Sequence, residues 1–411
     1  MMSASLTTST DIPVKKHPRL LSLDALRGFD MFWIVSGEEI FHGIAGVVQN
    51  KYSLTRNPVN WQIATDERLS VPERILVGIS NQLHHSPWNG FTFYDLIFPL
   101  FIFIAGISMA FSYGNRQGQS KAQAKAIEWS RYLQLFKRTC LLILLGMVVN
   151  GLLKFQGYDQ TRFASVLGRI GLACFFAAII YLNTSLRWQI VWFGVILLGY
   201  WMLLAWVPVP HYGAGVLSPA GNLASYIDQH FLPGKLHRKV YDPEGLLSTI
   251  PAIATAMMGL FTGRFLQWDA GHKLSPVKKM LIMFAVGILL IAIGLIWDIS
   301  FPINKNLWTS SFTIYAGGWS LLLFAAFYGI IDVAGYKKWC QPLVWIGTNS
   351  ILIYVAAHGL INFEHTSQYL FGGIINKTPL PWQHPWIWMG VLLIQLVLLR
   401  FLYRKKLFLK L

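Results

Sequence analysis

The run Phe93–Tyr113, FYDLIFPLFIFIAGISMAFSY, is almost wholly apolar and carries one charged residue, Asp95. A helix of about 20 apolar residues is long enough to cross the hydrocarbon core of a membrane. Further apolar runs lie at 28–47, 137–153, 165–183, 188–207, 246–266, 279–298, 312–334, 342–360 and 385–403. This pattern predicts an all-α polytopic integral membrane protein, a helical bundle of about ten transmembrane helices.

The composition supports the same class. Of the 411 residues 54% are hydrophobic and 13% are charged, and the mean hydropathy is +0.47. Soluble domains carry about 25% charged residues, so a soluble enzyme is excluded. The net charge of +16 would suit nucleic acid, but in a membrane protein basic residues gather in cytoplasmic loops. We therefore expect no nucleic-acid partner.

Loop charge predicts the orientation of the bundle. With a cytoplasmic amino terminus, 22 of the 34 basic residues fall in short cytoplasmic segments. Ten spans then place both termini in the cytoplasm. The predicted organisation is a cytoplasmic tail at 1–19 and one membrane domain at 20–411, whose outer loops are 48–92, 208–245 and 361–384.

The cysteines do not indicate a metal site. Cys140, Cys174 and Cys340 lie in or beside apolar runs without metal-ligand spacing, and we interpret them as small buried apolar residues. The sequence also has neither a zinc-type His/Cys cluster nor a phosphate-binding glycine loop. We expect no metal.

The segment His84-His85-Ser86-Pro87-Trp88-Asn89-Gly90 precedes Asp95 and contains turn signals. A turn here would bring Asp95 under His85, and the carboxylate would then fix the imidazole tautomer as in a catalytic His–Asp pair. Alternatively, Asp95 caps the helix that follows. Spacing alone favours the cap.

Two further polar groups interrupt the first apolar run. Glu38 and His42 are four residues apart and share a helical face. They are either functional groups at membrane depth or residues of the outer interface, and spacing does not choose between these interpretations. Arg27, at the cytoplasmic entry, pairs with Asp24 three residues before it, anchors the helix at lipid phosphates, or holds the phosphates of a cofactor. Anchoring is the favoured interpretation.

A third set of polar residues is predicted at or near the outer mouth. Side chains with paired donors and acceptors beside aromatic rings suit a sugar ligand, although each residue alone is better explained as an anchor or cap. The set comprises Trp88, Asn89, Arg169, Asp242, Glu244, Asn304, Lys305, Asn306, Asn349, Ser350 and His358.

Five blocks in order carry a resemblance to a known family. Leu23–Gly28, His85–Gly106, Tyr241–Gly245, Pro302–Trp308 and Asn349–Tyr354 are similar to the heparan-α-glucosaminide N-acetyltransferase family, within the transmembrane acyltransferases. The resemblance implies transfer of acetyl from cytosolic acetyl-CoA to an amino sugar or related glycan on the other face. It assigns the catalytic histidine to His85 and the aspartate to Asp95, and so favours the catalytic interpretation over the cap.

The resemblance also shapes the remaining expectations. We expect a bacterial-type member that lacks the family's lumenal domain and resides in the bacterial inner membrane. Glu38 stands where the family has an amide, close to the predicted base, and leaves the acceptor open. Arg27 and Arg138 are the candidates for the cofactor phosphates, on electrostatic grounds.

Several alternatives remain open. His85 can act as a general base or carry the acetyl group itself. A proton-coupled sugar permease, in which Glu38 or Asp95 couples protons, and an inactive scaffold are the other function classes. Membrane lipid and a small sugar or glycan are the expected partners, and exposed apolar helix faces would suit either lipid or a homodimer.

Overall fold

The computed structural model describes residues 20–113, 121–268 and 274–409, with only the backbone for 121–128. The predicted cytoplasmic tail 1–19 and the basic residues Arg116, Lys273 and Lys410 lie outside the described residues, as do the side chains of Lys121 and Lys125. Within these ranges the chain forms helices and three isolated β-bridges, without a strand. The predicted all-α class is confirmed.

Helices long and apolar enough to span a membrane match nine of the ten predicted runs among the described residues, and a bent pair matches the tenth. The long helices are α1 (Leu21–Phe32) with η1 (Trp33–Gly37) and α2 (Glu38–Tyr52), α4 (Phe93–Tyr113), α5 (Lys121–Val149), α6 (Val166–Asn183), α7 (Leu186–Trp206), α9 (Thr249–Gln267), α10 (Pro276–Asp298), α11 (Ser310–Phe327) with η4 (Tyr328–Val333), and α15 (Leu380–Arg404). The bent pair is α12 (Gln341–Thr348) with α13 (Ser350–Val355) and η5 (Ala356–Leu360). The protein is a polytopic helical membrane protein.

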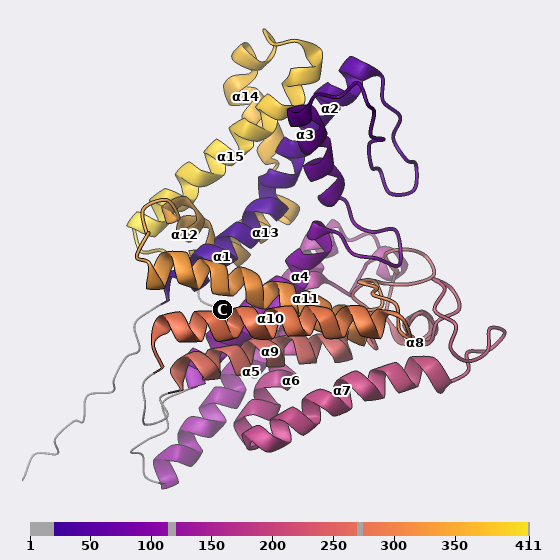
Figure 1. Cartoon of the computed structure of the whole chain (residues 1–411), viewed down its shortest axis with the longest axis vertical. Helices are drawn as coiled ribbons and strands as arrows, with labels where there is room; N and C mark the ends of the chain where they lie inside the picture. Colours follow the sequence, from indigo (N-terminus) through magenta and orange to yellow (C-terminus); the bar gives the residue numbers. More distant parts are fainter. Residues whose placement is uncertain (1–19, 114–120, 269–273, 410–411) are drawn as a thin grey trace, which may run out of the picture.

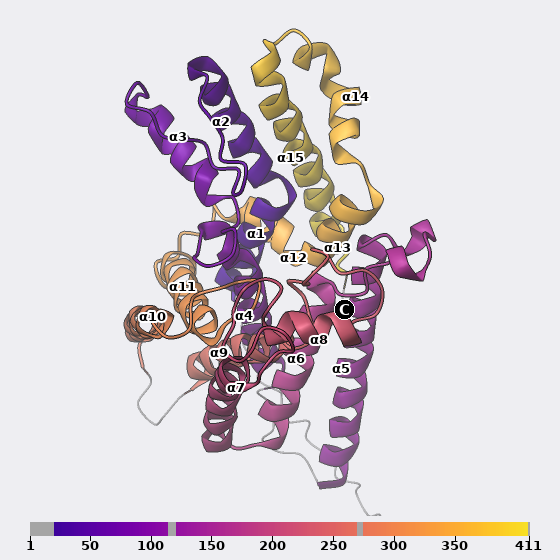
Figure 2. The same ribbon diagram turned by 90° about the vertical axis from the view of Figure 1, so that its right-hand side faces the viewer.

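Figures 1 and 2 show two parts of the molecule. The helices α2, α14 (Phe363–Ile375) and α15 gather at one end with the short α3 (Val71–Gln82), while α4 to α7 and α9 to α11 form the larger bundle. The helices α1, α12 and α13 lie between the two parts. The candidate site described below lies at this junction.

The first span is continuous despite its acidic residues. Glu38 and Glu39 begin α2 directly after the π-helical turn η1, and the helix runs on to Tyr52. The helix therefore does not end at the acidic pair. Glu38 makes side-chain contacts within the protein, to Tyr94 and His42, so its polar head is not left in an apolar environment.

Helix α4 is the buried centre of the larger bundle. Most of its side chains are buried, and it crosses α9 with backbone almost touching backbone. A Cβ at Gly106 would collide with the carbonyl oxygen of Ala256, and a Cβ at Gly259 would collide with that of Phe103. Small residues at such a crossing let two helices approach closely in a membrane protein. This packing fixes the position of Asp95 at the start of α4.

A second close crossing holds the bent pair. Gly28 of α1 packs against the carbonyl oxygen of Leu343, and Gly347 packs against that of Asp24. The chain then turns by 74° at Asn349. The Asn349 amide donates to Leu407 O at 3.1 Å and accepts from Leu409 N at 3.1 Å. The turn aims α13 and η5 toward the α4–α6 side of the bundle.

Two of the long segments predicted to lie outside the membrane contain helices. The segment between α2 and α4 contains α3, which contributes to a small core of Ala45, Val48, Leu54, Ile63, Leu69 and Val77. The segment between α7 and α9 contains α8 (Leu223–Phe231). Large apolar side chains face outward along α7, α10 and α15, as expected for helices in contact with lipid.

The three cysteines are free, and two of them match the expectation of burial. Cys174 and Cys340 are buried, whereas Cys140 is exposed. Cys140 lies on α5, whose large apolar side chains Leu141 and Leu144 are also exposed. The expectation was wrong for Cys140 because an apolar helix in a membrane places part of its apolar surface outward.

Candidate active site

His85 and Asp95 form a hydrogen-bonded pair. The distance from His85 Nδ1 to Asp95 Oδ1 is 2.8 Å. The Asp95 side chain is only 1% exposed, while that of His85 is 50% exposed. When Nδ1–H donates to the carboxylate, Nε2 carries the lone pair and can accept a proton. The turn expected between the two residues is therefore formed.

Asp95 also caps α4, so both interpretations of its spacing apply. Its Oδ2 accepts from Thr92 N at 3.1 Å, from Thr92 Oγ1 at 3.0 Å and from Ser86 N at 3.2 Å. Thr92 precedes the first residue of α4, and Asp95 reaches back to its backbone N–H as the third residue of a capping box does. Oδ2 thus holds the helix end, and Oδ1 orients the imidazole.

Lys305 lies against the same pair from the loop between α10 and α11. Its Nζ is 2.9 Å from His85 Nδ1, 3.0 Å from His85 Nε2 and 3.6 Å from Asp95 Oδ1. Asn304 holds this loop, since its Oδ1 accepts from Leu307 N at 2.9 Å. Burial lowers the pKa of Lys305, and the nearby Asp95 opposes this shift. Lys305 was expected to bind substrate, and the structure places it at the imidazole.

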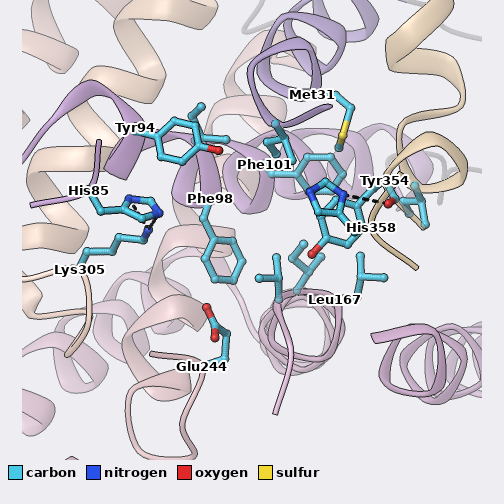
Figure 3. A pocket seen from close by; sticks show the side chains of 15 residues that line it. Met31, His85, Tyr94, Phe98, Phe101, Leu167, Glu244, Lys305, Tyr354 and His358 are labelled. Atoms are coloured by element: carbon cyan, nitrogen blue, oxygen red, sulfur yellow. Dashed lines mark hydrogen bonds between the residues drawn. The ribbon is translucent and has the colours of Figure 1, made fainter. Parts of the chain in front are cut away.

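A cavity of about 210 Å³ opens beside His85. In Figure 3, His85 and Lys305 lie on one side of it, and His358 and Tyr354 lie on the other. Its lining is formed by Met31, Ile34, His85, Tyr94, Ile97, Phe98, Phe101, Val166, Leu167, Ile170, Glu244, Lys305, Ile351, Tyr354 and His358. Side chains from α1, α4, α6 and the bent pair thus meet loop residues, as in ligand pockets that are mainly apolar with a few polar groups.

Glu38 is connected to His85 through Tyr94. The Tyr94 hydroxyl donates to Glu38 Oε2, and the Tyr94 ring lies 4.7 Å from the His85 ring, centroid to centroid. Glu38 Oε1 is 3.5 Å from His42 Nε2. The His42 ring in turn stacks on His84 at 4.0 Å. Glu38 therefore reaches the imidazole through one intervening side chain.

The two neighbouring histidines of the 84–85 pair have different environments. Burial lowers the pKa of His84 to about 4, with a further contribution from His42. Burial and the Lys305 ammonium lower the pKa of His85, against the opposing effect of Asp95. Both imidazoles are therefore neutral near pH 7, but only His85 lines the cavity among the described residues.

Glu244 enters the cavity from the segment after α8 and is held by an arginine that sequence reasoning missed. Arg162 donates to Asp242 Oδ1 at 2.6 Å and Oδ2 at 2.8 Å, and its Nη2 also donates to Glu244. Asp242 is buried and accepts from His237 N and Glu244 N at 3.0 and 2.9 Å. Of the two acids, Glu244 lines the cavity and Asp242 organises the loop. No local pattern marks Arg162, because its partners are 80 and 82 residues away.

Arg169 lies in the core of the larger bundle. It is 2% exposed, and its guanidinium carbon lies 5.0 Å from the Trp308 ring centre and 5.9 Å from that of Phe98. Its Nη2 donates to Ser248 Oγ and to Gly245 O. Arg169 is not among the described cavity-lining residues, although its neighbour Ile170 is.

Other members of the predicted sugar set lie around the site or apart from it. Trp88 donates from Nε1 to Leu217 O at 2.9 Å and packs against Tyr241. Asn89 accepts from Asn304 Nδ2 at 3.0 Å, which ties the loop of His85 to that of Lys305. Asn306 follows in the same loop. Asn349 and the adjacent Ser350 lie at the helix bend, where the Asn349 amide holds the chain near Leu407.

The other end of α4 borders a different cavity, of about 600 Å³. Its lining includes Tyr113 and the basic side chains Arg131, Lys137 and Arg138. Among the described residues, Arg138 Nε is buried without a hydrogen-bond partner. Arg27, on α1, donates to Ser108 Oγ at 2.7 Å. Arg27 and Arg138 thus both lie beside α4, toward the end of the helix that is opposite to Asp95.

Comparison with known proteins supports the resemblance. No family model matches the chain. The human (Homo sapiens) heparan-alpha-glucosaminide N-acetyltransferase is 29% identical over 341 residues, which is 68% of this chain and 49% of that protein. The mouse (Mus musculus) protein of the same name is 29% identical over 339 residues, with the same two shares. The chain thus spans about half the length of the curated relatives it matches, and its resemblance to heparan-alpha-glucosaminide N-acetyltransferases is confirmed.

Proposed function

We propose that this protein is a membrane acetyltransferase that moves the acetyl group of cytosolic acetyl-CoA to an amino sugar or related glycan on the outer face. The observation that carries the proposal is the His85–Asp95 pair, with His85 at the wall of a cavity. The name of the human and mouse relatives supports the same reaction class. Because those relatives are about twice as long as the matched region, the activity is a proposal for this chain.

The chemistry requires a base near the reacting amine. An amino sugar attacks the thioester carbonyl only as the free amine, and a neutral imidazole can accept the amine proton as the bond forms. Asp95 Oδ1 would keep Nδ1–H in place and direct Nε2 toward the substrate. The same imidazole could instead take the acetyl group and pass it on, which is the covalent version of the proposal.

The cavity lining favours a small polar acceptor on an apolar wall. Its volume of about 210 Å³ lies below the common range for drug-sized ligands, so it suits one sugar ring or the acetyl end of the donor. Glu244 and His358 would supply hydrogen-bond partners, and Tyr94 and Tyr354 would supply ring faces. Glu38, one side chain away from His85, supplies negative charge that favours an ammonium group at the mouth.

The basic cavity at the other end of α4 fits the phosphates of the donor. Three basic side chains line it, and the buried, unpartnered Arg138 Nε is a donor without an acceptor among the described residues. Phosphate oxygens would satisfy this donor. We propose that Arg138 holds a CoA phosphate and that Arg27, which contacts α4 at Ser108, meets the donor further along. No metal enters this proposal.

We further propose the inner membrane of a bacterium as the location, with membrane lipid around the exposed helices. The two ends of α4 would then face opposite compartments, the periplasm at Asp95 and the cytoplasm at Tyr113. Loop charge supports this orientation. Exposed apolar faces on α7, α10 and α15 are available to lipid or to a second copy of the chain.

The test uses detergent-purified full-length protein with acetyl-CoA and a panel of amino sugars. We expect release of CoA thiol together with an acetylated sugar detected by mass spectrometry, and thermal stabilisation by acetyl-CoA alone. The proposal fails if acetyl-CoA neither stabilises the protein nor loses its acetyl group at near-millimolar concentration. Uptake of labelled sugar into proteoliposomes without acetyl-CoA would favour the permease instead.

A further inference from the structure

The position of Lys305 is unusual for a residue whose role is to bind substrate. Its Nζ lies almost equally far from both ring nitrogens of His85, at 2.9 and 3.0 Å. An atom in the ring plane at these distances would collide with the carbon between the two nitrogens. The ammonium group therefore lies over the face of the imidazole, away from the in-plane direction of the Nε2 lone pair.

The charges around His85 indicate how Lys305 affects the protonation of the imidazole. A lone His–Asp pair favours the protonated imidazole, because the carboxylate stabilises the extra charge. Here Lys305 Nζ is 3.6 Å from the same carboxylate, and the Lys305 side chain is only 14% exposed. Asp95 and Lys305 thus offset each other, and a proton on His85 would add a second positive charge beside the ammonium.

Other titratable groups face His85 from each element packed against it. Tyr94, from the same helix as Asp95, contacts the ring, and Glu38 from α2 acts through the Tyr94 hydroxyl. Glu244 lines the same cavity but is engaged by Arg162. His84 precedes His85 and stacks on His42. Among the described groups, Lys305 is the cation in direct contact with the imidazole.

We propose that Lys305 is a positioning residue that keeps His85 unprotonated near neutral pH, so that Nε2 is available as the base. The proposal rests on the acetyl transfer proposed above. In that step the acceptor nitrogen bonds to the thioester carbonyl carbon and its proton passes to Nε2. The carbon–sulfur bond then breaks, and the proton leaves with the CoA thiolate, so His85 returns to its neutral form.

The electrostatics of the site agree with the geometry. Burial and Lys305 outweigh Asp95 and hold the pKa of His85 below its ordinary value of 6.5. Loss of the Lys305 charge removes one of the two effects that lower the pKa of His85. The effect of the Asp95 carboxylate, which raises this pKa, stays intact. The pKa of His85 then rises, and a larger fraction of the imidazole is protonated at neutral pH.

The experiment measures the protonation of His85 without any acetyl transfer. Diethyl pyrocarbonate modifies the neutral imidazole, so the rate of His85 modification, resolved by peptide mass spectrometry, is followed against pH. In the wild type we expect a midpoint below 6.5. In Lys305→Met the midpoint should rise by about 1 pH unit, and Lys305→Arg, which keeps the charge, should restore it.

The activity profile gives the second readout. The acid limb of kcat/KM should move with the modification midpoint, to higher pH in Lys305→Met and back in Lys305→Arg. Equal midpoints in wild type and Lys305→Met would overturn the inference, even if the rate fell. If the Lys305→Met variant does not fold, Lys305→Gln takes its place. A wild-type modification midpoint at or above pH 6.5 overturns the inference without any variant. Absence of thiol release from wild type would instead refute the proposed function, since the modification assay does not depend on it.

Discussion

The charged groups at the two ends of helix α4 differ in how far they are hydrogen-bonded within the protein. At Asp95 the carboxylate accepts four hydrogen bonds, one of them from His85, and Lys305 contacts the same imidazole. At Tyr113 the helix borders a cavity with three basic side chains, where Arg138 Nε has no partner among the described residues. A network of fixed geometry suits a step in which bonds are made and broken. Uncompensated positive charge suits reversible binding of a polyanion. Substitutions at the first end should therefore change the rate of chemistry, and those at the second should change affinity.

The largest effect is expected at His85. His85→Gln removes the base and should lower kcat by about 1,000-fold, in the range of general acid–base catalysis. Release of CoA thiol with an amino sugar measures this loss. His84→Gln is the matched control, because His84 stacks on His42 and is absent from the cavity lining among the described residues, and it should change kcat by less than about 10-fold. Comparable losses in both variants would contradict the assignment of the base.

The second effect separates the two functions of Asp95. Asp95→Asn weakens the hold on Nδ1–H and should lower kcat by about 100-fold, since the wrong tautomer is no longer excluded. Thr92→Ala removes the Thr92 Oγ1 bond to Oδ2 but leaves Oδ1 on His85. It should lower stability by ~1 kcal/mol, the usual cost of a lost cap, with little change in kcat. Thermal melting and thiol release, measured on both variants, test the separation. A rate loss in Thr92→Ala equal to that in Asp95→Asn would show that the helix cap alone explains the effect.

Features of the site that depend on local contacts could be predicted from the sequence, whereas those that depend on distant contacts could not. The apolar run of α4 and the turn signals before Asp95 are local patterns, so they could be read from the sequence. Spacing alone favoured a cap at Asp95, and the family resemblance was needed to favour the pair with His85. Sequence could not show that one carboxylate serves both as cap and as orienting group, because the two roles use different oxygens. Lys305 lies 220 positions from His85 and reaches it only through the packing of α11 beside α4.

The least predictable residues are those whose burial depends on tertiary packing. Arg169 was expected at the mouth because it is charged and near a predicted helix start, yet aromatic rings of α4 and of the loop before α11 enclose it. Asn349 was expected to bind sugar, and the structure uses it to hold the bend and the chain at Leu407. An isolated polar residue in an apolar run does not reveal whether a ligand or a backbone group will satisfy it.

A smaller effect is expected at the basic end of α4. Arg138→Ala should raise KM for acetyl-CoA about 10-fold with kcat unchanged, because a charge-assisted bond to phosphate is lost. The same variant should leave KM for acetyl-pantetheine unchanged, since that donor lacks the adenosine phosphates. Arg187→Ala is the control, an arginine at the start of α7 that does not line this cavity among the described residues. An equal rise for both donors would place the phosphates elsewhere.

The smallest effect tests which end of α4 meets the acceptor. Glu38→Gln keeps a hydrogen-bond acceptor for Tyr94 but removes the negative charge one side chain from His85. The loss of one partly screened charge, ~1 kcal/mol, should raise KM for an amino sugar about 5-fold and leave KM for acetyl-CoA unchanged. Glu39→Gln is the matched control, because Glu39 lies 3.5 Å from His384 and is 41% exposed. If Glu38→Gln instead raised KM for acetyl-CoA, the negative charge would be acting on the donor, and the division between the two ends of α4 would fail.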